Sequence, residues 1–187
     1  MGSDNYQGIW VFAEQRKGKL KNVAYELLAK GRELADILKA ELSAVCFGHG
    51  IEAVNQLIAH GADKVYMVDS PELAAEQEDL YTQQLVALIQ QYKPEIVLAG
   101  ATSLGRAFIP RVAAILKTGL TADCTGLDID AEQRLLLQTK PSFGGNVMAL
   151  IICPEKRPQM STIRPRVFRR NEPDETRKGQ IIKVDFD

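Results

Sequence analysis

Three residues that could bind an anion, Thr102, Ser103 and Arg106, directly follow a short apolar segment at residues 95–100. That segment is typical of a buried strand, and the apolar pattern over residues 108–116 predicts a helix behind the three residues. Free backbone N–H groups at a helix start, together with a guanidinium, favour a phosphate group or the edge of a cofactor. The same residues also fit a structural role, in which Thr102 or Ser103 caps the helix and Arg106 is solvated. Both interpretations stay open at this point.

A second candidate is the glycine-bearing turn made by Phe143, Gly144, Gly145 and Asn146. Its two glycines would let the backbone approach a flat ligand or a partner closely. A hairpin turn with no binding role explains the same residues equally well.

Several kinds of site are not favoured by the sequence. The first apolar segment is not followed by the dinucleotide fingerprint G-x-G-x-x-G, and the phosphate-loop pattern G-x-x-x-x-G-K-[ST] is absent. No histidine follows Cys124, so a cysteine nucleophile with a neighbouring base is not expected there. Cys46 and Cys153 lie in apolar segments, and the cysteines are expected to be buried small hydrophobes in a reducing compartment. His49 and His60 are not spaced with other metal-ligating residues, so we expect no metal site.

The composition is that of an ordinary globular chain, with 187 residues, 45% apolar residues and a net charge of -1. This length fits one domain, or one domain with a tail. The charge offers no basic surface for nucleic acid, and no apolar run is long enough to cross a membrane. Residues 1–5 lack the charged and apolar regions of a secretory signal, so the sequence predicts a cytoplasmic protein.

Strand and helix patterns alternate four times before the sequence changes character. The expected strands are residues 8–13, 42–48, 64–69 and 95–100, and the helical patterns cover residues 23–38, 51–58, 81–92 and 108–116. Such alternation predicts an α/β fold, a Rossmann-like, doubly wound and mostly parallel sheet with helices on both faces. Pro110 is expected in the first turn of the last helix, where a missing N–H does little harm.

The pattern changes after Gly119, where short apolar segments are separated by turns. These segments predict strands that extend the sheet with antiparallel members, at residues 127–130, 135–139, 147–153 and 159–163. From residue 169 onward the sequence is charged and predicts an arm, with one more strand at residues 180–184. We therefore expect a domain over residues 1–168, followed by a charged linker over residues 169–187.

Four segments, taken together, are similar to one protein family. They are G-A-T-S-L-G-R at residues 100–106, T-G-L-T-A-D-C at 118–124, G-G-N-V-M-A at 144–149 and R-P-Q-M at 157–160. In these segments and in their order, the chain resembles the N-terminal domain of the alpha subunit of electron-transfer flavoproteins, including the FixB branch. The resemblance implies a fold like that of the adenine nucleotide alpha-hydrolases.

The resemblance also implies partners and cofactors. An alpha subunit of this family pairs with a beta subunit, and this domain would be a platform that helps to enclose the FAD or AMP held there. A separate FAD-binding domain would follow the charged arm, so this chain alone is not expected to bind FAD. The redox partner would be an acyl-CoA dehydrogenase or a similar protein, and residues 118–127 resemble the anaerobic branch, some of whose members bifurcate electrons from NADH. The chain itself would be an electron-transfer component without catalytic residues.

Roles for individual residues follow from the same resemblance. Lys140 and the turn at residues 143–146 are expected to face the cofactor of the beta subunit, where a cation would favour an anionic reduced flavin. Arg164 and Arg166 are expected at the junction with the partner subunit or domain. Thr102, Ser103 and Arg106, from the pattern described above, are expected to be further cofactor contacts.

Two other functions stay open. A stand-alone nucleotide-binding or hydrolase protein of the same fold would use Thr102, Ser103 and Arg106 on a phosphate group. A domain that only mediates assembly would contact no cofactor at all.

Overall fold

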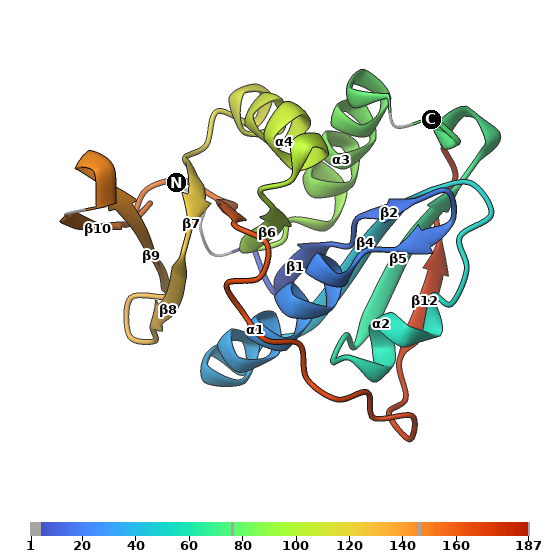
Figure 1. Ribbon diagram of the computed structural model, residues 1–187, viewed down its shortest axis with the longest axis horizontal. Coiled ribbons are helices and arrows are strands. Elements are labelled where there is room, and N and C mark those ends of the chain that lie inside the picture. Colours follow the sequence, from blue (N-terminus) through green and yellow to red (C-terminus); the bar gives the residue numbers. More distant parts are fainter. Residues whose placement is uncertain (1–4, 76, 146, 187) are drawn as a thin grey trace.

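The protein is built on a central sheet of seven parallel strands (Figure 1). The computed structural model describes residues 5–75, 77–145 and 147–186. The strand order is β12-β5-β4-β1-β6-β11-β7. The strands are β1 (Ile9–Phe12), β4 (Leu42–Gly48), β5 (Lys64–Asp69), β6 (Ile96–Gly100), β7 (Leu120–Cys124), β11 (Gln159–Ile163) and β12 (Gln180–Lys183). The Rossmann-like, mostly parallel sheet predicted from the sequence is therefore confirmed.

Helices cover both faces of this sheet. Ile9 and Val11 of β1 pack into one apolar core with α1 (Asn22–Leu38) and α2 (Asn55–Ala59). Trp10 and Phe12 point to the opposite face and pack with α3 (Glu78–Tyr92) and α4 (Ser103–Leu116). Because successive side chains of a strand point to opposite faces, a strand covered on both faces must be apolar throughout. That requirement explains the continuous apolar segment seen at the start of the sequence.

Three antiparallel strands lie in the second half of the chain, as the pattern predicts, but they form a sheet of their own. The prediction is wrong for residues 159–163, which form β11, because the chain returns there to the central sheet and pairs in parallel with β6 and β7. The three antiparallel strands are β8 (Gly126–Asp130), β9 (Leu135–Ser142) and β10 (Val147–Ile151), in the order β10-β9-β8. Figure 1 shows this small sheet beside the main body, and the chain enters it directly after β7. At the junction, Asp123 has a φ of 67° and the register between β11 and β7 shifts. Such an irregularity bends a strand away from its sheet.

The remaining short elements join the larger ones. They are the hairpin of β2 (Gln15–Arg16) and β3 (Lys19–Leu20), and the 3-10 turns η2 (Pro71–Leu73) and η3 (Phe143–Gly145). Pro110 lies in the interior of α4 and not in its first turn, because that helix already begins at Ser103. An interior proline leaves the carbonyl of Arg106, four residues earlier, without its helical N–H donor. No helix in the described residues is long and apolar enough to cross a membrane.

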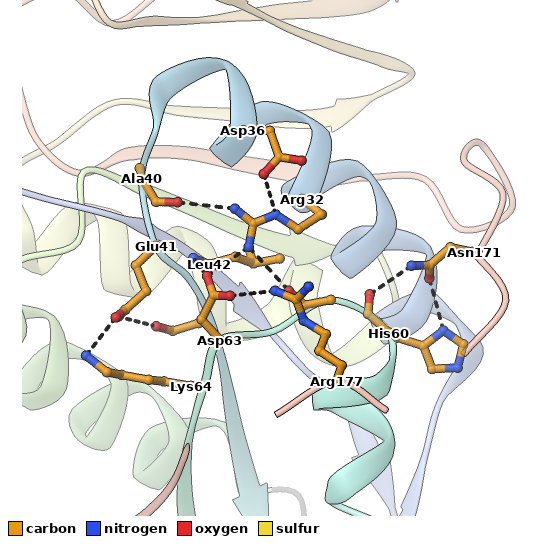
Figure 2. A network of polar contacts seen from close by, with 12 residues as sticks. Arg32, Asp36, Ala40, Glu41, Leu42, His60, Asp63, Lys64, Asn171 and Arg177 are labelled. Carbon is orange, nitrogen blue, oxygen red and sulfur yellow. Dashed lines mark hydrogen bonds and ion pairs between the residues drawn. The ribbon is translucent and has the colours of Figure 1, made fainter. Parts of the chain in front are cut away.

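The charged C-terminal segment is attached to the body of the domain. It passes over α1 and α2 and then adds β12 beside β5, in parallel (Figure 1). On the way, the Arg166 N–H donates to the buried carboxylate of Glu26 over 2.7 Å. Further along, the guanidinium of Arg177 forms an ion pair with Asp63 at 2.5 Å (Figure 2). The linker predicted over residues 169–187 thus includes the last strand of the central sheet.

Candidate functional site

The first candidate site lies at the carboxyl ends of the central strands, where α4 begins. Gly105 lies so close to the end of β6 that an added Cβ would be 1.9 Å from the carbonyl oxygen of Gly100. Only a glycine allows this approach between strand and helix. The helix N-terminus is thereby fixed against the sheet, and the residues that start it are held at the sheet edge.

The hydroxyl of Thr102 caps α4 from inside the protein. It accepts a hydrogen bond from the Gly105 N–H at 3.1 Å and donates one to the carboxylate of Glu14 at 2.5 Å. Glu14 is 2% exposed and also forms an ion pair with Lys21 at 2.5 Å. A carboxylate of the chain itself therefore lies at the position where a ligand anion would benefit from the helix N-terminus. The capping interpretation is confirmed for Thr102, while Ser103 is exposed as the first residue of the helix.

Arg106 and Arg164, which the sequence analysis assigns to different roles, share one carboxylate. Arg106 bonds to Oδ1 of Asp123 at 2.9 Å, and Arg164 is 3.2 Å from Oδ2. Burial acts to raise the pKa of Asp123, but hydrogen bonds from both arginines and their charges lower it overall. The arginine side chains are 59% and 47% exposed. One carboxylate balances one of the two guanidinium charges, so this edge carries surplus positive charge. Several guanidinium N–H groups also have no acceptor among the residues that the structure describes.

Lys140 lies on β9, opposite Ala149 of β10. Burial raises the pKa of the Cys124 thiol, and the positive charge of Lys140 acts in the opposite direction. The adjacent residue, Thr139, accepts a backbone hydrogen bond from Thr125, so β9 brings Lys140 close to Cys124 and to Asp123, whose carboxylate the arginines share. The structure therefore brings Lys140 to the same region as Arg106 and Arg164.

The glycine turn lies at the far end of the same hairpin. Phe143 starts η3, Gly144 and Gly145 have φ values of 69° and 93°, and the space where their Cβ atoms would lie is open. Both glycines are needed for this left-handed backbone. Asn146 lies outside the described residues. Arg166 has a φ of 67° and an exposed side chain, while its backbone is attached to Glu26.

An exposed apolar surface on β10 was not predicted from the sequence. Val147, Met148 and Leu150 are 49%, 56% and 64% exposed, and Ile152, just after the strand, is 46% exposed. The strand is at the edge of the small sheet, so one side of its backbone has no neighbouring strand among the described residues. A long apolar edge strand is a surface that proteins usually cover with a partner. The continuous apolar run of residues 147–153 was the available signal, but a fully buried strand has the same pattern.

The cysteines do not form a reactive or metal-binding centre in the part of the chain described. Cys46 and Cys124 are buried as expected, but Cys153 is partly exposed, so the expectation of burial is wrong for that residue. It lies two residues beyond the exposed strand β10, with its Sγ next to Gly119. No group of three or more His, Cys, Asp or Glu residues that could hold a metal occurs among the described side chains.

Comparisons with known proteins agree on one family. The family model described as "Electron transfer flavoprotein domain" matches residues 9–187. The alpha subunit of electron transfer flavoprotein from Thermoanaerobacterium thermosaccharolyticum is 54% identical, over 98% of this chain and 56% of its own length. The corresponding subunit from Clostridium acetobutylicum is 53% identical over 90% of the chain and 50% of its own length.

A third relative carries a more specific name. The protein named "Acryloyl-CoA reductase electron transfer subunit beta" from Anaerotignum propionicum is 43% identical, over 90% of the chain and 52% of its own length. The chain thus spans about half the length of the curated relatives it matches.

Proposed function

The chain belongs to the electron transfer flavoprotein domain family, and from this premise we propose that it is the platform domain of an alpha subunit. In this role it pairs with a beta subunit and helps to enclose the FAD or AMP that the beta subunit holds. In this role the chain itself makes and breaks no covalent bonds. It provides a rigid wall that orients the partner and excludes water from the cofactor.

The observation that carries the proposal is the exposed apolar edge strand β10. Leu150, at 64% exposure, and its neighbours Val147 and Met148 lie on a small sheet that stands beside the main body (Figure 1). Burying such side chains against a partner is favourable by about 25 cal/mol for each Å² of apolar surface. The relatives are named as alpha subunits, which supports a beta subunit as the partner that covers this strand.

The surplus positive charge beside this small sheet supports a cofactor role. Arg106 and Arg164 have donors beyond those used on Asp123, and the strand that carries Lys140 is joined to Thr125 through the backbone of Thr139. These residue types suit the phosphate groups of FAD or AMP, and the open glycine turn would admit a flat ring. A flavin bound in the beta subunit would supply the electron transfer. The cations of this chain would hold its phosphates and favour its anionic reduced form.

The redox partner proposed is an acyl-CoA dehydrogenase or a related enzyme. One relative is named as an electron transfer subunit of an acryloyl-CoA reductase, which supports an acyl-CoA partner for this chain as well. NADH-dependent bifurcation is proposed on the sequence of residues 118–127 alone.

A stand-alone nucleotide-binding or hydrolase role receives less support. The phosphate in that role would bind beside Thr102, but the Thr102 hydroxyl is already paired with Glu14 and with the Gly105 N–H. Co-expression with the cognate beta subunit tests the proposal. We expect one co-migrating complex on gel filtration with bound flavin, whereas two independently migrating proteins would contradict it.

A further inference from the structure

A cavity of about 770 Å³ lies at the amino ends of the central strands, on the edge opposite to the candidate site. Gly8, Ser43 and Lys64, which precede or begin β1, β4 and β5, contribute to its wall. Its volume is in the range of about 300–1,000 Å³ that is typical of small-molecule sites. Neither the sequence motifs nor the proposed function assigns a role to this cavity.

Two buried aromatic side chains line the cavity, and their hydrogen-bond donors have no partner among the described residues. Trp10 is 4% exposed and Tyr66 is 6% exposed, and their ring centroids are 5.1 Å apart. Within residues 5–75, 77–145 and 147–186, neither the indole N–H nor the phenol O–H has a hydrogen bond. Buried tryptophan and tyrosine usually find an acceptor for these groups. Tyr92 extends the aromatic wall, with its ring 4.6 Å from that of Tyr66.

The charged residues around the cavity leave a positive surplus. Lys64 is paired with Glu41 at 2.7 Å (Figure 2), and a bidentate contact joins Arg134 to Glu95. Two more cations line the cavity, Lys39 at the end of α1 and Arg157 before β11. Neither forms an ion pair with any residue that the structure describes.

The guanidinium of Arg157 is held in place by the backbone. Its nitrogens donate to the carbonyls of Lys156 at 2.9 Å and Arg134 at 3.3 Å. These carbonyls fix the position of the charge without neutralising it. A cation held in this way at a cavity wall can attract an anion without first losing side-chain freedom.

We propose that this cavity binds a small organic anion that carries a planar ring and a carboxylate or phosphate group. The ring lies along the aromatic wall at Tyr92, and the anionic oxygens accept from Trp10 and Tyr66. Lys39 and Arg157 balance the charge. Its aromatic wall lies on the central sheet and α3, apart from β10, where the proposed beta-subunit contact lies. Among the described residues, only Gln133 and Arg134, in the turn between β8 and β9, bring the small sheet to this cavity.

Tryptophan fluorescence provides a direct test, because Trp10 is the only tryptophan of the chain. Phenyl phosphate, benzoate and inorganic phosphate are titrated separately into the chain. We expect a saturable fluorescence change with phenyl phosphate or with benzoate, and the stronger of the two identifies the anionic group. An equal response to inorganic phosphate would overturn the proposed ligand class. The absence of a saturable change with either ring-bearing probe up to about 10 mM would overturn the site.

Matched variants separate binding in the cavity from general effects. Tyr66→Phe removes only the hydroxyl and should weaken binding by at least about tenfold, because a hydrogen bond to a charged group contributes about 1.5 kcal/mol or more. Tyr25→Phe, outside the cavity, should leave affinity unchanged. Lys39→Asn should weaken binding by up to about fivefold. Lys117→Asn is its control, because both lysines end helices with left-handed φ values, 51° and 54°. Equal affinities in the cavity variants and their controls would contradict the proposal.

Discussion

The hydroxyl of Thr102 donates a 2.5 Å hydrogen bond to Glu14, a carboxylate 88 residues earlier in the chain. The contact joins the end of β1 to the start of α4 and places a negative charge at the helix N-terminus. This buried carboxylate disfavours an anion such as a phosphate group at the helix N-terminus. The carboxyl edge of the sheet therefore presents its free donors further out, on Arg106 and Arg164.

Thr102→Val tests this internal cap. The variant removes the acceptor of the Gly105 N–H and a donor to buried Glu14, so the free energy of unfolding should fall by about 1–3 kcal/mol. Ser103→Ala removes the adjacent, exposed hydroxyl and should change stability by less than about 0.5 kcal/mol. Urea unfolding of both variants measures the difference. Equal losses would show that Glu14 and Thr102 are not a stabilising pair.

Asp63→Asn tests the attachment of the C-terminal segment. Asp63 is bound by Arg32 at 2.8 Å, by Arg177 at 2.5 Å and by the Leu42 N–H at 2.9 Å (Figure 2). Loss of the charge should lower the free energy of unfolding by about 1–3 kcal/mol and speed hydrogen exchange in β12.

The control for this prediction is Asp36→Asn. Asp36 also pairs with Arg32, but its side chain is 67% exposed. An exposed pair of this kind contributes about 0–1 kcal/mol. If amide hydrogen exchange in β12 is as slow in Asp63→Asn as in wild type, contacts other than those of Asp63 hold the strand.

The same carboxylate predicts a pH dependence. Burial acts to raise the pKa of Asp63, but the Leu42 N–H and the guanidiniums of Arg32 and Arg177 lower it below its usual value. Because the folded pKa is lower than the unfolded value of about 3.9, protonation favours the unfolded chain. The stability gap between wild type and Asp63→Asn should thus be complete above about pH 5 and shrink below about pH 4. Urea midpoints measured across this range check the sign, and a gap that grows in acid would contradict it.

Thiol reactivity should distinguish the three cysteines. Burial, with a further contribution from the charge of Asp69, raises the pKa of Cys46 to about 12. Burial also raises the pKa of Cys124, whereas Cys153 is partly exposed. Since the thiolate is the reactive form, a disulfide reagent at about pH 8 should modify only Cys153 in the folded chain. Cys153→Ser should abolish that rapid reaction, and rapid labelling of Cys46 would show that its strand opens readily.

The sequence predicts the framework of this protein well because its signals are local. The continuous apolar segment at β1 requires covered faces on both sides, and Thr102 stands where a helix cap belongs. Glu14, in contrast, could not be assigned to the same site, because only the folded sheet brings its carboxylate to α4. The sharing of Asp123 by Arg106 and Arg164 likewise depends on a left-handed φ and a register shift that no local pattern specifies.

The exposed strand β10 illustrates a different limit. The apolar run of residues 147–153 predicts a strand correctly, but it does not state whether the covering layer belongs to the same chain or to another. The cavity at the opposite edge was missed for a related reason. Trp10 and Tyr66 lie in apolar strand segments that predict core residues, and only the fold shows that both side chains line a cavity.

The most direct test of the proposed platform role is the affinity for the cognate beta subunit, measured for wild type, Leu150→Lys and Ile37→Lys. Both replaced side chains are exposed, at 64% and 47%, but Leu150 lies on β10 and Ile37 lies on α1. We predict that Leu150→Lys weakens the complex by at least about tenfold, or about 1.4 kcal/mol, while Ile37→Lys binds like wild type. Undiminished binding of the beta subunit by Leu150→Lys would contradict the account.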